Sequence, residues 1–209
     1  RFKHKDITKI GSGNPGTMNM SREFGLKVGI ITFFCDAFKG GIPALITYFV
    51  YRSYYFSGTN VVVSDFTRYF CGACVIIGHI FPITMKFHGG KGIASTLGLF
   101  WINLGCENPW FLLVGFAAFW LIAFYIAGTE WGSMGSLIGV SGFGLWQGVI
   151  FWLRYRTEIN NPYVIALFML VLLINFLTWF AHRKNILRLL SGEEHRTSVK
   201  KMLHKKKKA

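Results

Sequence analysis

The chain has 209 residues, of which 52% are apolar, 17% aromatic and only 15% charged. Soluble domains carry about 25% charged residues, so this composition argues against an ordinary water-exposed surface and indicates a membrane protein. The net charge is +14. In so apolar a chain, the excess of cations favours anionic lipid headgroups or phosphorylated substrates as partners, and we expect no nucleic-acid partner.

A basic arm, residues 1–27, precedes the first apolar stretch and contains the sequence Gly-Ser-Gly-Asn-Pro-Gly at residues 11–16. This also fits G-x-G-x-x-G, but no strand is predicted before it and a membrane helix follows, which argues against a dinucleotide fold. Glycine-rich backbone can still direct N–H groups at an anion. The groups that we expect to add hydrogen bonds or charge are Ser12, Asn14, Asn19 and Arg22. A plain turn with solvated polar residues is the alternative interpretation.

Five apolar stretches are long enough to cross a membrane, which takes about 20 helical residues for about 30 Å of hydrocarbon. They are residues 28–50, 61–85, 110–128, 134–153 and 162–181. Residues 93–105 form a shorter run, about 20 Å as a helix, which we count as a sixth crossing. The sequence therefore predicts an all-α integral membrane protein with six transmembrane helices, folded as a single domain over residues 1–209.

Two of the predicted helices carry charged pairs three residues apart, Asp36 with Lys39 and Asp65 with Arg68. At that spacing both members of a pair share one helical face and can neutralise each other. Charges inside membranes are costly and often functional. A structural role in holding the helices together is equally compatible with the pattern.

A second polar segment, within residues 78–92, ends on a glycine-rich loop before the short apolar run. Its last four residues are Gly89, Gly90, Lys91 and Gly92. Backbone amides at the start of a helix, next to a lysine, are suited to binding an oxyanion. His79 and His88 flank the loop, and we expect both to be structural rather than catalytic.

The third polar segment opens the tail, residues 182–209, directly after the last apolar stretch. His182, Asn185 and Arg188 are spaced three apart, so a helix would place a proton carrier, an amide and a cation in one row. A basic interfacial helix that only touches lipid headgroups is the alternative. The lysine run at residues 205–208 is predicted to be a solvated or lipid-attracted tail.

Six crossings would place the arm, the glycine-rich loop and the tail on one side of the membrane. The arm carries six Lys and Arg residues, the loop two and the tail ten. Those on or near the other side are Arg52, Arg68, Arg154 and Arg156. Because cytoplasmic segments are enriched in Lys and Arg, this distribution predicts that the three polar segments face the cytoplasm.

Taken together, the three segments resemble the motifs of the bacterial acyl-phosphate:glycerol-3-phosphate acyltransferases, the PlsY type. The resemblance rests on residues 11–22, 78–92 and 182–193, and on Asp-Ala-Phe-Lys-Gly at residues 36–40, in the order of that family and over nearly the whole chain. It implies an integral membrane enzyme with seven membrane helices, so we expect one further helix before Arg1. One departure is Met18, which lacks the hydroxyl that the family usually has there.

The resemblance implies transfer of an acyl group from acyl phosphate to the 1-hydroxyl of glycerol 3-phosphate. The products would be phosphate and lysophosphatidic acid, in the first step of membrane phospholipid synthesis at the bacterial cytoplasmic membrane. No metal or other cofactor is expected; the expected partners are the two substrates and the lipid bilayer. The implied catalytic residues are Ser12, Arg22, Lys91, His182 and Asn185. The residues expected to bind phosphate are Gly13, Asn14, Asn19, Gly89, Gly90, Gly92 and Arg188. Glu193 is expected to be structural.

Two other functions are compatible with parts of the pattern. An organic-phosphate transporter also uses glycine-broken helices and cations, but places them at the membrane midplane. Acyl-CoA-dependent glycerol phosphate acyltransferases use a His-x4-Asp pair, and none of the six histidines here has Asp five residues later. The proton of the attacking hydroxyl would go to the substrate's own phosphate or to His182.

Overall fold

The computed structural model describes residues 6–194 and 196, so the lysine run at residues 205–208 lies outside the described residues. The described part consists of helices and connecting loops, which confirms the all-α prediction. Two short 3-10 turns also occur, at Ile7–Lys9 and Ile83–Met85. The helices are α1 (Thr17–Phe24), α2 (Leu26–Tyr51), α3 (Val63–Ile80), α4 (Ile93–Glu107), α5 (Phe111–Thr129), α6 (Gly132–Tyr155), α7 (Pro162–Ala181) and α8 (Arg183–Leu190).

Five of the described helices are long and apolar enough to cross a membrane: α2, α3 with its following turn, α5, α6 and α7. They coincide with the five long stretches predicted from the sequence. The sixth expected crossing, residues 93–105, falls in α4, which has only 15 residues and does not reach the length of a usual span.

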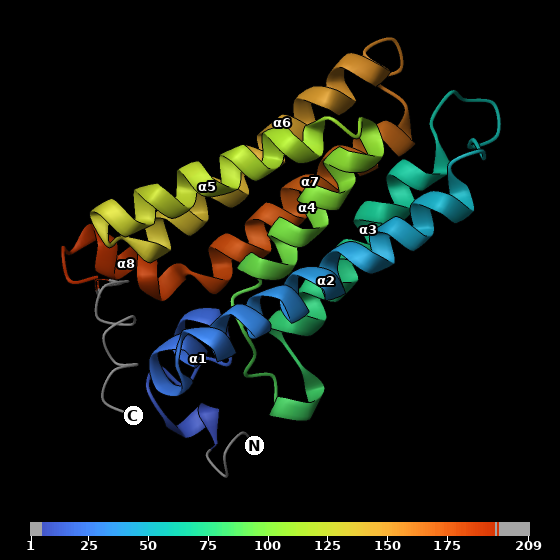
Figure 1. Cartoon of the computed structure of the whole chain (residues 1–209). Helices are drawn as coiled ribbons and strands as arrows, with labels where there is room; N and C mark the ends of the chain where they lie inside the picture. Colours follow the sequence, from blue (N-terminus) through green and yellow to red (C-terminus); the bar gives the residue numbers. More distant parts are fainter. Residues whose placement is uncertain (1–5, 195, 197–209) are drawn as a thin grey trace.

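Although short, α4 is the central helix of the bundle. It packs against α2, α3, α5, α6 and α7, and eight of its residues are buried. In Figure 1, it runs from the end of the bundle that holds α1 and α8 towards the opposite end. A helix enclosed by other helices does not need to match the lipid thickness, which explains how so short a segment fits here.

Helix α3 ends at Ile80, five residues before the predicted limit of residue 85. The cause is Pro82, which has no N–H to donate and disfavours helical backbone at the residue before it. Phe81 accordingly leaves the helical region, with φ −124° and ψ 59°. The apolar stretch that was predicted to end at residue 85 therefore coincides with the candidate span Val63–Met85, but its α-helix ends at Ile80 and a 3-10 turn completes it.

Helix α2 lies against α4 with almost no side chain between the two backbones. A Cβ atom on Gly40 would lie 2.0 Å from the carbonyl oxygen of Ser95, and one on Gly98 would lie 2.1 Å from that of Ala37. Small residues allow such close approach between membrane helices. In contrast, α5 buries only Gly115, so most of its surface is left for lipid.

At the end of the bundle away from α1 and α8, four charges join α3, α4 and α6. Arg68 donates to Asp65 at 2.5 Å and to Glu107 at 2.8 Å, while Arg154 donates to Asp65 at 2.7 Å and also bonds Glu107. The hydroxyl of Tyr155 adds a hydrogen bond of 2.6 Å to Asp65. The predicted Asp65 and Arg68 pair is thus half of a larger structural network.

Candidate functional site

The glycine-rich loop before α4 is fastened to the end of α3. The amide of Gly89 donates to the carbonyl of Ile80 at 3.2 Å, and that of Gly90 donates to the carbonyl of His79 at 3.1 Å. These two amides were expected to bind phosphate, but they are already used within the protein. Gly92 adopts a left-handed backbone with φ +80° and caps α4, which begins at Ile93.

Lys91 joins this loop to the third polar segment. Its ammonium group donates to the side-chain oxygen of Asn185 at 2.5 Å, across 94 residues of sequence. Burial lowers the pKa of Lys91 to about 8; Glu194 opposes this shift, whereas the cations Arg188 and Arg22 add to it. Lys91, Arg22 and Arg188 thus lie close enough for their charges to interact.

The carboxylate of Glu194 organises the groups around Lys91. It accepts hydrogen bonds from Ser133 at 2.5 Å, from Asn185 at 2.7 Å and from Arg188 at 3.0 Å. Burial raises the pKa of Glu194, but these hydrogen bonds outweigh it and the pKa is lowered overall. The charged form of this acid therefore holds α8 against the first turn of α6.

The contacts expected of Glu193 are made by its neighbour Glu194. Glu193 is exposed, and its carboxylate lies 3.5 Å from the hydroxyl of Ser191. The left-handed turn at Gly192 decides which of the two carboxylates points inward, and sequence spacing alone does not reveal that choice. Ser133 was also missed, because a serine in a glycine-rich apolar helix carries no recognisable signal.

His182 is buried at the junction of α7 and α8. Its Nδ1 lies 2.8 Å from the carbonyl oxygen of Thr178, which can only accept, so the ring proton sits on Nδ1 and Nε2 is an acceptor. Burial lowers the pKa of His182 to about 4, and the nearby charge of Lys91 lowers it further. The imidazole is therefore neutral at pH 7 and able to accept a hydrogen bond.

The N-terminal glycine loop, residues 11–16, is shaped by its own asparagines. The side chain of Asn19 accepts from the amide of Ser12 at 3.0 Å and donates to the carbonyl of Ile10 at 3.1 Å. The side chain of Asn14 accepts from the amide of Gly16 at 2.8 Å. Both were expected to bind phosphate, whereas these hydrogen bonds give them a part in the shape of the loop. Gly13 has φ +68°, a conformation that glycine adopts easily.

The structure thus brings together only part of the expected set. One hydrogen-bonded cluster contains Lys91, Asn185 and Arg188. The charge of Arg22 lowers the pKa of Lys91, and the charge of Lys91 lowers the pKa of His182. Ser12 is exposed, and within the described part of the chain its hydroxyl makes no hydrogen bond to the other two segments.

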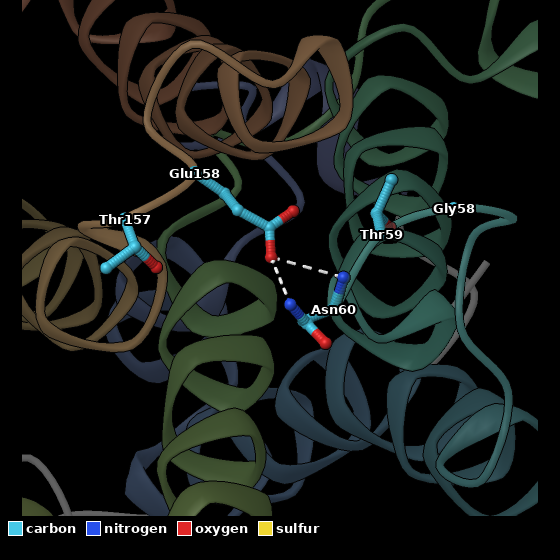
Figure 2. A pocket seen from close by; sticks show the side chains of 5 residues that line it. All are labelled: Gly58, Thr59, Asn60, Thr157 and Glu158. Carbon is cyan, nitrogen blue, oxygen red and sulfur yellow. Dashed lines mark hydrogen bonds between the residues drawn. The ribbon is translucent and has the colours of Figure 1, made fainter.

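A hollow of about 640 Å³ lies at the opposite end of the bundle (Figure 2). It is open, and Glu158 is the only charged residue among the five that line it: Gly58, Thr59, Asn60, Thr157 and Glu158. The backbone and side-chain amides of Asn60 donate to Glu158 at 3.2 and 2.8 Å and so join two loops. With neither a cation nor an imidazole, this hollow is a poor match for a phosphorylated substrate.

Comparisons with known proteins identify the family of this chain. Residues 1–192 match the family described as glycerol-3-phosphate acyltransferase. The enzyme of that name from Mycoplasmopsis pulmonis is 36% identical over 200 residues, which cover 93% of this chain and 82% of the relative. The one from Clostridioides difficile is 33% identical over 201 residues, covering 96% and 86%.

Solved structures agree as well. The crystal structure of PlsY, an integral membrane glycerol 3-phosphate acyltransferase, in its glycerol 3-phosphate form superposes with a TM-score of 0.72 at 28% identity, over 96% of this chain and 86% of that chain. Its lysophosphatidic acid form gives a TM-score of 0.69. The chain therefore belongs to the glycerol-3-phosphate acyltransferase family and is an integral membrane acyltransferase.

Proposed function

We propose that this acyltransferase takes its acyl group from an acyl phosphate and attaches it to the 1-hydroxyl of glycerol 3-phosphate. The products are lysophosphatidic acid and inorganic phosphate. The reaction takes place on the cytoplasmic face of a bacterial cytoplasmic membrane, where Lys and Arg accumulate. The observation that carries the proposal is the cluster in which Arg188 and Arg22 lie near Lys91, and Lys91 lies near a neutral histidine, His182.

This cluster suits two phosphorylated substrates, which repel each other unless cations stand between them. Lys91 is the most direct phosphate ligand, because its ammonium group has only one hydrogen-bond partner in the described structure and can donate three bonds. Arg188 donates from Nε to Glu194, and its two terminal nitrogens can bind a second oxyanion. The first turn of α4 adds backbone N–H groups that have no partner within the helix.

The chemical step needs little more than alignment, because an acyl phosphate is already a mixed anhydride. The 1-hydroxyl oxygen attacks the acyl carbon, the bond between that carbon and the phosphate oxygen breaks, and phosphate leaves with the bonding electrons. His182 Nε2 accepts a hydrogen bond from the hydroxyl and orients it. A phosphate dianion, with a pKa of about 6, is a stronger base than an imidazole with a pKa of about 4, so phosphate takes the proton.

The test compares acyl donors on the purified protein in lipid vesicles. Palmitoyl phosphate and palmitoyl-CoA are each supplied with glycerol 3-phosphate, and lysophosphatidic acid and phosphate are measured. We expect product from palmitoyl phosphate only, with one phosphate released per acyl group transferred. Equal use of palmitoyl-CoA would contradict the proposed donor. Counterflow of labelled glycerol 3-phosphate across the vesicles, without product, would support the transporter instead.

A further inference from the structure

A three-residue cluster on α2 and α3 lies beside the glycine-rich loop and takes no part in the reaction described above. Lys39 donates to Asp36 at 2.7 Å, and its Nζ lies 2.5 Å from Nδ1 of His79. The same carboxylate oxygen of Asp36 is 3.7 Å from that ring nitrogen. The side chains of Asp36 and His79 are only 14% and 9% exposed, whereas that of Lys39 is 41% exposed.

The ammonium group of Lys39 determines which ring nitrogen of His79 carries the proton. An ammonium group only donates, so Nδ1 of His79 accepts the bond from Lys39 and the ring proton resides on Nε2. Asp36 accepts a second hydrogen bond from the same ammonium group. The ring of His79 is therefore clamped in one orientation by two residues of a different helix.

The other edge of this clamped ring lies against Gly90. A Cβ atom on Gly90 would lie 2.0 Å from Nε2 of His79, so no larger residue fits while the ring stays in place. The backbone of His79 also holds the loop, because its carbonyl accepts the amide of Gly90 at 3.1 Å. Side chain and main chain of His79 thus both touch the residue immediately before Lys91.

We propose that Asp36, Lys39 and His79 are positioning residues that set the direction in which Gly90 presents Lys91 to the phosphate of glycerol 3-phosphate. The inference rests on the proposed function, in which Lys91 binds that phosphate. A different outcome is expected if the cluster merely holds α2 against α3. Loss of such a contact would lower stability and the fraction of active enzyme, but would leave the affinity of the remaining sites unchanged.

The first experiment separates these two roles by kinetics. In Lys39→Met, the ring of His79 loses its clamp, and we expect the KM for glycerol 3-phosphate to rise about tenfold, equivalent to about 1.4 kcal/mol, with kcat changed by less than about twofold. Lys27→Met is the matched control, since Lys27 is an exposed cation on the same helix without contact to the loop. A lower kcat at unchanged KM in Lys39→Met would overturn the proposal.

The second experiment is a double-mutant cycle across the contact itself. Gly90→Ala places a methyl group against the clamped ring and should raise the KM for glycerol 3-phosphate. His79→Ala removes the ring, so Gly90→Ala should cost much less in that background. The proposal requires this non-additivity, and strictly multiplicative effects on KM would contradict it.

The same variants also distinguish a failed inference from a failed proposed function. Wild-type protein that does not turn over palmitoyl phosphate would contradict the proposed donor only. In that case, calorimetric titration of each variant with glycerol 3-phosphate reads the positioning directly. Weaker binding in Lys39→Met than in Lys27→Met supports the cluster, and equal binding overturns it.

Discussion

At the residue scale, the properties of Lys91 depend on where the fold places it. Burial and two neighbouring arginines work against its charge, and one hydrogen bond to Asn185 and the nearby carboxylate of Glu194 support it. A cation kept partly desolvated interacts more strongly with an incoming phosphate than one in water. The price is a charge that is lost at only moderately alkaline pH.

Replacing Lys91 tests its role as a phosphate ligand. Lys91→Ala should raise the KM for glycerol 3-phosphate at least about tenfold, because a hydrogen bond to a charged group contributes about 1.5 to 3 kcal/mol. Lys91→Arg should restore only part of the affinity, since the planar guanidinium does not match the compact ammonium group. Steady-state kinetics with varied glycerol 3-phosphate measure both effects, and an unchanged KM in Lys91→Ala would remove Lys91 from the site.

The pH dependence follows from the direction of the two pKa shifts. Lys91 has a pKa lowered to about 8, so the free enzyme loses this cation as the pH rises through 8, and kcat/KM for glycerol 3-phosphate should fall there. His182, with a pKa of about 4, is already neutral below pH 6 and adds no change between pH 6 and 8. Measuring kcat/KM from pH 6 to 10 tests this; Lys91→Arg should lack the decline at pH 8.

Single residues are also where sequence-based prediction was least accurate. The segments that carry Lys91, His182 and Asn185 were recognised from residue types and order. The sequence did not show which polar atoms are free to bind a substrate. Asn19 and Gly90, for example, use their polar groups in hydrogen bonds within the protein. A pattern of donors does not reveal which of them are already occupied in the folded chain.

At the element scale, the turn after α8 completes the site. Its carboxylate, Glu194, reaches Ser133 on α6, so the end of the described tail is tied to the beginning of a membrane helix. The polar segments thus depend on contacts between elements that lie far apart in sequence.

The two adjacent glutamates offer a matched pair of variants. Glu194→Gln removes the charge that raises the pKa of Lys91, so the alkaline decline in kcat/KM should move to lower pH and activity at pH 8 should fall. Glu193→Gln should behave like wild type, because its carboxylate is exposed. The measurement is kcat/KM of both variants from pH 6 to 10. An equal effect of the two substitutions would contradict the conclusion that Glu194, and not Glu193, supports the charge of Lys91.

The charged network at the opposite end makes a prediction about stability alone. Arg68→Met leaves Asp65 and Glu107 with Arg154 as their only cation, and breaking a buried pair typically costs about 3 to 5 kcal/mol. Arg52→Met is the control, since Arg52 is exposed and its guanidinium lies over the ring of Phe49. Thermal unfolding in detergent should show a large decrease for Arg68→Met and a small one for the control.

Helix positions were predicted well and helix ends less so. The long apolar stretches located α2, α5, α6 and α7 because about 20 apolar residues have few other stable environments. The end of α3 was missed because the apolar pattern continues past Pro82, although its backbone does not. The short α4 was recognisable as a helix, but not as the buried centre of the bundle.

At the scale of the whole molecule, the two ends of the bundle hold different elements. α1, α8 and the loop before α4 gather at one end, and the connections α2 to α3 and α6 to α7 lie at the other (Figure 1). The grouping of α1, α8 and the loop at one end agrees with the prediction that the three polar segments share one side. Helix α4 runs between the two ends, although it is not among the five helices long enough to be candidate spans.

Sidedness can be tested by labelling. After the four native cysteines are replaced by alanine, Ser191→Cys and Thr157→Cys place single exposed thiols at the two ends. A membrane-impermeant maleimide added to intact cells should label Thr157→Cys only, and Ser191→Cys should react after the membrane is opened. Labelling of both thiols in intact cells would contradict a cytoplasmic site.

The position of α4 has a consequence for biogenesis. This helix is short and ends on Glu107, whose charge is balanced by Arg68 of α3 and by Arg154 of α6. During synthesis α3 is made before α4, and α6 is made after it. Until α6 is made, Glu107 therefore has Arg68 as a partner but not Arg154. The loop in front of it also lacks Asn185 until α8 is made. A chain interrupted before α6 therefore lacks Arg154, and Arg68 alone is left to balance the charge of Glu107.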